Sequence, residues 1–159
     1  MAVVRYSRRM TSHSESRLVP YSADLMFAVV ADVERYPEFL PWVTELRVLS
    51  REQVKGRDVI QARMSVGFAR FTESYTSRVV LDPGGRTIDV VQTEGPFRVL
   101  ENHWRFTPEG EGCRIDFSIS YEFRNVLLNL AASAAFDRVT RRMADAFETR
   151  ARYLSKKTA

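Results

Sequence analysis

The last alternating segment limits most strongly what this 159-residue chain can fold into. From Cys113 to Phe123 every second residue is apolar, and the residues between them are polar or charged. Neighbouring side chains on a β-strand point to opposite faces, so the pattern predicts a strand with one buried and one wet face. A sheet with only one covered face is typically antiparallel. The chain must therefore supply a second layer that covers the buried face.

The segment from Leu127 to about Leu154 is predicted to be that layer, because its apolar residues recur with the period of an α-helix. Arg138, Arg141 and Arg142 fall off the apolar stripe and are expected to face solvent. The predicted fold class is α+β, with a curved antiparallel sheet of about seven strands wrapped around one long C-terminal helix. If the concave side of the sheet is wider than the helix, the remaining space becomes a cavity.

Turn residues divide the rest of the chain into further elements. A first strand is expected from Glu15 to Val19, and a helix is expected between its N-cap Ser22 and Ala31. Further strands are expected at 43–52, 57–66, 68–81, 87–94, 99–107 and 113–123. Residues 1–13 are basic and rich in serine, and they are predicted to be a disordered tail. Residues 14–155 are predicted to form one domain.

The connector at 32–42 places large apolar side chains where a surface loop is normally polar. Pro37 and Pro41 stiffen its backbone, and each disfavours helical geometry for the residue before it. The connector therefore either plugs a core or forms the rim of an apolar pocket. Its large apolar side chains are Tyr36, Phe39, Leu40 and Trp42.

Positive charge gathers at the two ends of the chain, whose net charge is +4. Residues 1–17 carry a net charge of +3 and residues 124–159 carry +5, whereas the segment between them carries −4. This asymmetry favours contact with an anionic surface, either lipid headgroups or RNA. The alternative is a solvated helix face and an unstructured tail.

The sequence offers little catalytic chemistry. The single cysteine, Cys113, cannot form an internal disulfide, which favours a reducing cytoplasm. His13 in the predicted tail and His103 on a wet strand face form no metal-binding pair, and no nucleophile motif is present. No apolar run approaches the roughly 20 residues that would span a bilayer. We expect a protein without a metal, without a cofactor and without enzymatic activity.

From about Glu15 to Tyr153, the chain resembles the coenzyme Q-binding START-domain family and its close relative, the bacterial ribosome-association toxin family. The connector, the later Gly95-Pro96-Phe97 run and the strand that carries Trp104 carry this resemblance. It implies a helix-grip fold with a hydrophobic tunnel between the sheet and the last helix. It also implies a carrier or chaperone that binds ubiquinone or a similar polyprenyl lipid as a ligand rather than as a redox cofactor. Such a protein would support respiratory electron transport and quinone biosynthesis, in the cytoplasm or at the inner membrane.

The resemblance and the alternation together predict site residues. The mouth of the tunnel is expected at Phe39, Leu40, Pro41, Trp42 and Phe97. The lining is expected at Met64, Phe71, Leu100, Trp104, Phe117, Tyr121, Phe136, Val139, Met143 and Phe147. Arg63, Tyr75 or Tyr121 could donate hydrogen bonds to a quinone ring.

Two other functions remain open. In a ribosome-binding interaction protein, Arg138, Arg141 and Arg142 would contact ribosomal RNA and the cavity would be incidental. A polyketide aromatase or cyclase would share the fold, but the sequence shows no evident acid or base for that chemistry.

Overall fold

The computed structural model describes residues 10–157, which form one curved antiparallel sheet of seven strands with helices against it. The strand order is β1-β7-β6-β5-β4-β3-β2. This confirms the predicted α+β helix-grip fold. The elements are β1 (Thr11–Val19), α1 (Ala23–Ala31), the 3-10 turn η1 (Val33–Arg35), α2 (Tyr36–Phe39), β2 (Val43–Val54), β3 (Arg57–Phe68), β4 (Phe71–Asp82), β5 (Thr87–Glu94), β6 (Phe97–Glu109), β7 (Gly112–Phe123) and α3 (Val126–Lys157).

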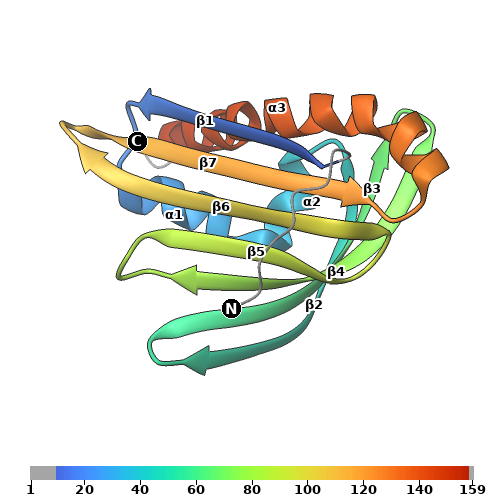
Figure 1. Cartoon of the computed structure of the whole chain (residues 1–159). Helices are drawn as coiled ribbons and strands as arrows, with labels where there is room; N and C mark the ends of the chain where they lie inside the picture. The colour runs from blue at the N-terminus through green and yellow to red at the C-terminus, as the bar shows by residue number, and fades with distance from the viewer. Residues whose placement is uncertain (1–9, 158–159) are drawn as a thin grey trace.

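All three α-helices lie on the same side of the sheet (Figure 1). The long helix α3 runs beside β1 and β7, α1 packs against β5 and β6, and α2 packs against the edge strand β2. The inward residues of β7 are buried, as the alternation predicted: Cys113, Ile115, Phe117, Ile119, Tyr121 and Phe123 are all at most 2% exposed. The core therefore lies between one face of the sheet and the helices.

Strand β1 begins at Thr11, four residues before the predicted start at Glu15. Thr11 pairs with Tyr121 and His13 pairs with Ile119, so these residues continue β1 along the edge of β7. This corrects the prediction that the tail extends to His13. The rest of the predicted tail, residues 1–9, lies outside the described residues.

The connector contains the short helical turns η1 and α2, and the expectation that Pro37 would keep Tyr36 out of helical geometry was wrong. Tyr36 has helical backbone angles (φ −51°, ψ −43°), whereas Leu40 is extended (φ −103°, ψ 103°). The helical geometry of Tyr36 survives beside Pro37 because the Leu40 N–H donates to the Tyr36 carbonyl at 2.8 Å and closes the turn. The Tyr36 hydroxyl also donates to the Val30 carbonyl of α1. The connector is thereby fixed to the end of α1.

The β3–β4 hairpin turns two residues later than predicted. Gly67, expected to break the chain, stays inside β3, and its N–H donates to the Trp42 carbonyl at 2.8 Å. The turn is made at Ala69, which has a positive φ of 52°. The tip of the β3–β4 hairpin therefore comes after the residue at which β3 bonds to the connector.

Hydrogen bonds and ion pairs fasten α3 to the sheet at two places along its length. Near its start, the Tyr121 hydroxyl donates to the Ser133 carbonyl at 3.0 Å, and Asn129 Oδ1 accepts the N–H of Phe123 at 3.2 Å. Farther along, the Arg17 guanidinium of β1 lies 2.7 Å from the Asp145 carboxylate. The helix is thus held across the concave face.

Candidate ligand-binding site

A cavity of about 70 Å³ lies between the inner face of the sheet and α3. It has room for a few water molecules but not for a long lipid chain. Its walls come from the connector, from strands β2 to β6 and from α3. The lining residues are Val33, Tyr36, Leu46, Ala62, Met64, Tyr75, Ser77, Val79, Val90, Leu100, Asn102, Trp104, Met143 and Phe147.

Half of the predicted lining residues border this cavity and half do not. Those that border it are Met64, Leu100, Trp104, Met143 and Phe147. Those that do not are Phe71, Phe117, Tyr121, Phe136 and Val139. Alternation identifies the inward face of a strand, but it does not show which inward positions border an empty space.

The excluded aromatic residues fill the core instead. Phe136 of α3 packs edge-on against Tyr121, with ring centroids 4.5 Å apart, and lies 5.4 Å from Phe68. Phe117 stacks on Trp104 at 4.1 Å, behind the cavity wall. This aromatic packing closes the cavity toward the start of α3.

Phe97, predicted at the mouth, is fully buried with 0% exposure. Its ring stacks on Phe123 at 4.5 Å. Its backbone is fixed by the Gln92 side chain, which donates to the Phe97 carbonyl at 2.8 Å and accepts the Phe97 N–H at 3.1 Å. The residue therefore closes the β5–β6 turn from within the core, and its assignment to the mouth is corrected.

Phe39, Pro41 and Trp42 line an open groove between the connector and α3, where Arg142 and Arg150 form part of the opposite side. The same three residues were predicted at the mouth of a tunnel, and their role in ligand entry stays a prediction. Leu40, which was also predicted there, is 1% exposed and belongs to the core. The connector thus plugs the core with one residue and borders a surface groove with its neighbours.

Phe39 separates this groove from the cavity. Its ring packs edge-on against Phe147 at 5.6 Å and against Tyr36 at 6.0 Å, and both partners line the cavity. On its other side the Arg150 guanidinium lies 5.0 Å from the Phe39 ring centroid. Phe39 thus lies between residues of the groove and residues of the cavity.

One wall of the cavity is polar. The Ser77 side chain is buried, and its hydroxyl has no hydrogen-bond partner among the described residues. Asn102 Oδ1 accepts the indole N–H of Trp104 at 3.1 Å, which leaves its amide nitrogen as a donor. Burial raises the pKa of the Tyr75 hydroxyl well above its usual range, so this group stays neutral. The cavity therefore combines apolar walls with uncharged hydrogen-bonding groups.

Sequence reasoning missed Ser77 and Asn102, although a signal was available. Ser77 lies between Tyr75 and Val79 on the inward face of β4, and Asn102 lies between inward residues of β6. A polar residue at an inward position is the kind of exception that marks a site.

Of the three predicted ring donors, only Tyr75 borders the cavity. Arg63 is exposed on the outer face of the sheet, where it contacts the Thr76 hydroxyl at 3.4 Å. Tyr121 uses its hydroxyl to hold α3. The assignments of Arg63 and Tyr121 are corrected accordingly.

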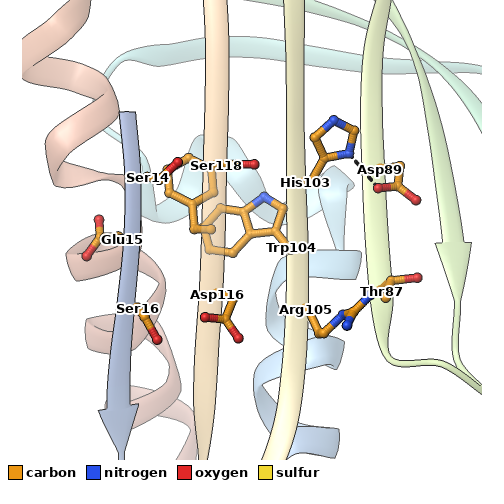
Figure 2. A pocket seen from close by; sticks show the side chains of 11 residues that line it. Ser14, Glu15, Ser16, Thr87, Asp89, His103, Trp104, Arg105, Asp116 and Ser118 are labelled. Carbon is orange, nitrogen blue, oxygen red and sulfur yellow. Dashed lines mark hydrogen bonds and ion pairs between the residues drawn. The ribbon is translucent and has the colours of Figure 1, made fainter. Parts of the chain in front are cut away.

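The outer face of the sheet carries a wide polar depression over β1, β7, β6 and β5 (Figure 2). Small side chains such as Ser14 and Ser118 leave it hollow, and it is open to solvent. His103 Nδ1 lies 2.6 Å from Asp89 Oδ1 at its rim (Figure 2). His103 therefore lies on the wet face, as predicted, in a surface hydrogen bond rather than in an enclosed site.

The predicted contact arginines differ in their surroundings. Arg141 pairs with Asp137 one turn earlier at 2.9 Å. Arg138 and Arg142 are exposed and form no ion pair within residues 10–157. One end of the same helix is apolar on its solvent side, where Leu127 and Leu130 are each 76% exposed. The outer surface of α3 therefore passes from apolar to basic.

Other chemistry is absent from the part of the chain that the structure describes. No three His, Cys, Asp or Glu side chains there are grouped so that they could hold a metal ion. No helix there has the length and apolar character needed to cross a membrane.

The curved sheet, the long helix across it and the enclosed space between them define a helix-grip protein of the START-like class. The chain belongs to the polyketide cyclase/dehydrase and lipid transport family, whose model matches residues 19–148. The family resemblance inferred from the connector is thereby confirmed.

Two relatives of different names match most of the chain. The ribosome association toxin RatA of Escherichia coli K12 is 38% identical over 144 residues, which cover 90% of this chain and 88% of the relative. The mitochondrial coenzyme Q-binding protein COQ10 homolog B of Xenopus laevis is 36% identical over 143 residues, covering 87% of this chain and 57% of the relative. Both branches of the predicted family are therefore represented at similar identity.

Solved structures agree with the fold. The 18 kDa protein CC1736 of Caulobacter crescentus superposes with a TM-score of 0.76 at 36% identity, covering 92% of this chain and 99% of that one. Some structures with the same fold are aromatase/cyclases, at less than 25% identity, and this likeness shows the fold alone.

Proposed function

We propose that the protein binds ubiquinone or a similar polyprenyl lipid and acts as its carrier or chaperone, in support of respiratory electron transport and quinone biosynthesis. The observation that carries the proposal is the enclosed cavity, which has apolar walls and a buried hydroxyl that lacks a partner. Apolar burial at about 25 cal/mol per Å² supplies affinity for such a ligand, and polar groups orient it. The name of the coenzyme Q-binding relative supports the same reading.

Because the cavity is small, we propose that it receives the head of the lipid rather than the tail. A tail would leave past Phe39 and lie along the groove beside α3, where Trp42 and Ala146 offer apolar surface. The proposal therefore includes a rotation of the Phe39 ring when the ligand enters.

The exposed surface of α3 supports loading at the inner membrane. Leu127 and Leu130 would enter the interfacial layer, and Arg138 would meet anionic headgroups about two turns later. Flotation with vesicles that contain phosphatidylglycerol tests this contact. Binding should fall when both leucines are replaced by serine, and equal binding would contradict the assignment.

The test of lipid binding is organic extraction and native mass spectrometry of protein purified from a quinone-producing host. A stoichiometric polyprenyl quinone supports the carrier function. Protein that contains no such lipid, and takes none up from quinone-loaded vesicles, contradicts it.

Ribosome association is the second candidate function, because Arg138 and Arg142 are exposed without ion pairs and because a relative carries that name. Contact with ribosomal RNA would weaken steeply with salt. Co-sedimentation with ribosomal subunits should disappear in the Arg138→Glu/Arg142→Glu variant. Reversal of Arg47 and Arg63, which are exposed on the outer face of the sheet, is the matched control. Co-sedimentation that survives the α3 reversal would contradict this candidate.

The aromatase or cyclase alternative gains no support from the site. The lining of the cavity contains no carboxylate and no histidine that could exchange protons with a polyketide. We therefore assign no catalytic step to the protein, and turnover of a supplied polyketide would overturn this assignment.

A further inference from the structure

The Ser77 hydroxyl is an unusual group in the core. It lies on the inward face of β4, the residue is 5% exposed, and Oγ has no partner among the described residues. A buried hydroxyl without a hydrogen bond destabilises a folded protein, whereas an alanine of similar size would not. The position is therefore occupied by a residue that favours something other than the stability of the empty protein.

Asn102 and Tyr75 present further polar groups to the same cavity. The Asn102 carbonyl oxygen is already used by Trp104, so the group that remains is the amide N–H₂, which can only donate. The Tyr75 hydroxyl is kept neutral by burial and can donate as well. Together with Ser77, these groups call for a ligand atom that accepts hydrogen bonds.

The pairing of the strands sets the distance between Ser77 and Asn102. Val79, the next inward residue after Ser77, pairs with Val90, and Val90 pairs with Asn102. Ser77 and Asn102 therefore lie on strands two positions apart, about 10 Å between backbones. Both residues line the same cavity, so a single ligand head placed there contacts both.

The lining of the cavity disfavours a charged ligand. Neither an acidic nor a basic side chain borders the cavity. An ionised carboxylate or phosphate placed there would lose its hydration without a counter-ion, which costs far more than a few hydrogen bonds return. The head of a fatty acid or of a phospholipid is thereby disfavoured.

From these observations we infer that Ser77 and Asn102 form a polar subsite in the cavity, and that Ser77 selects the head of the ligand by donating a hydrogen bond to a carbonyl oxygen of its ring. Asn102 serves a second oxygen or the same one. The inference rests on the proposed lipid-binding function, and it adds the residue that recognises the head group.

The experiment compares two ligands that share a tail. Ubiquinone-2 carries two isoprene units on a quinone ring, and geranylbenzene carries the same tail on a ring without oxygen. Affinities are measured by titration calorimetry for the wild type, Ser77→Ala, Ser77→Thr and Ser118→Ala, the last being a control on the outer face of the sheet.

We expect Ser77→Ala to weaken ubiquinone-2 binding about three- to tenfold, the loss of one neutral hydrogen bond, with geranylbenzene binding unchanged. Ser77→Thr keeps the hydroxyl and should restore the affinity, and Ser118→Ala should match the wild type. The melting temperature of the empty Ser77→Ala protein should rise by about 2–4 °C, because the unpaired hydroxyl is gone. A merely structural serine would not give opposite signs for stability and for quinone affinity.

Equal ubiquinone-2 affinity in Ser77→Ala and in the wild type would overturn the subsite while the lipid-binding function stands. Equal losses for both ligands would also overturn it, because the effect would then not depend on the carbonyl oxygens. A wild-type protein that binds neither ligand would overturn the proposed function and the subsite together.

Discussion

The rings of Phe39 and Phe147 meet edge to face, with centroids 5.6 Å apart, and this contact separates the surface groove from the internal cavity. One ring belongs to the short helix α2 of the connector and the other to α3. The connector was expected either to plug the core or to form the rim of a pocket, and the structure shows it doing both: Leu40 is in the core and Phe39 lies at the boundary.

Replacing Phe39 by alanine should connect the groove with the cavity. We expect release of a bound quinone to accelerate at least tenfold in stopped-flow transfer to acceptor vesicles, because no large ring then obstructs the exit. The matched control is Phe27→Ala, which removes another half-buried phenylalanine that packs on Phe106 at 6.2 Å, away from the groove. Equal release rates in the two variants would show that Phe39 does not control the exit.

Leu40 should matter for stability rather than for ligand retention. The residue is 1% exposed, so Leu40→Ala leaves a cavity and should lower the free energy of unfolding by about 2–5 kcal/mol. Urea denaturation followed by circular dichroism measures this. Pro41→Ala, at an exposed position next to it, serves as the comparison and should cost much less. A loss below about 1 kcal/mol for Leu40→Ala would contradict its place in the core.

Gly112 at the start of β7 has a steric role. A Cβ atom at this position would lie 1.9 Å from the Val19 carbonyl oxygen, so even alanine would push β1 and β7 apart. We expect Gly112→Ala to be destabilising by more than about 2 kcal/mol and to increase amide exchange along β1. Gly110→Ala, in the preceding turn, has open space around the added Cβ but a positive φ of 60°, and should cost only about 1 kcal/mol. Similar losses in the two variants would contradict the steric argument.

Stability should fall in alkaline solution because the partly buried Tyr36 and the buried Tyr75 ionise less readily in the folded protein. Burial raises the pKa of Tyr36 and of Tyr75 above the value of 10.0 that applies to an exposed tyrosine. Below pH 10 both hydroxyls are protonated in the folded and unfolded states; above it only the unfolded chain ionises, so folding stability is lost as the pH rises. Each group contributes at most about 1.4 kcal/mol per pH unit. The slope of unfolding free energy against pH should be shallower in Tyr75→Phe, and an unchanged slope would contradict this origin.

Much of the fold could be predicted because alternation and helical periodicity report burial directly. The strand at Cys113 to Phe123 and the helix that covers it follow from which residues avoid water. The predicted boundaries were wrong where the nearby residues alone do not determine the structure. Ala69 rather than Gly67 makes the hairpin turn, and Thr11 joins β1 because β7 offers it an edge, which only the assembled sheet reveals.

The candidate site was predictable only in part, for a related reason. The sequence distinguishes inward from outward positions, so Trp104 and Met143 could be assigned to the interior. Whether an inward residue borders a cavity or packs against a neighbour depends on how the helix crosses the sheet. Phe136 and Phe117 fill the core for this reason. Ser77 was missed, although it is a polar exception within an apolar strand face.

The fastening of α3 at two places along its length has a consequence for how a bound ligand exchanges. Tyr121 and Asn129 hold one end of the helix, and Arg17 holds a later turn through Asp145 and Glu148. A helix held in this way resists moving away from the sheet as a rigid body. Exchange would then be governed by α2, a single turn of four residues, and the lifetime of a bound molecule would reflect the fluctuations of this small segment rather than the global stability of the protein.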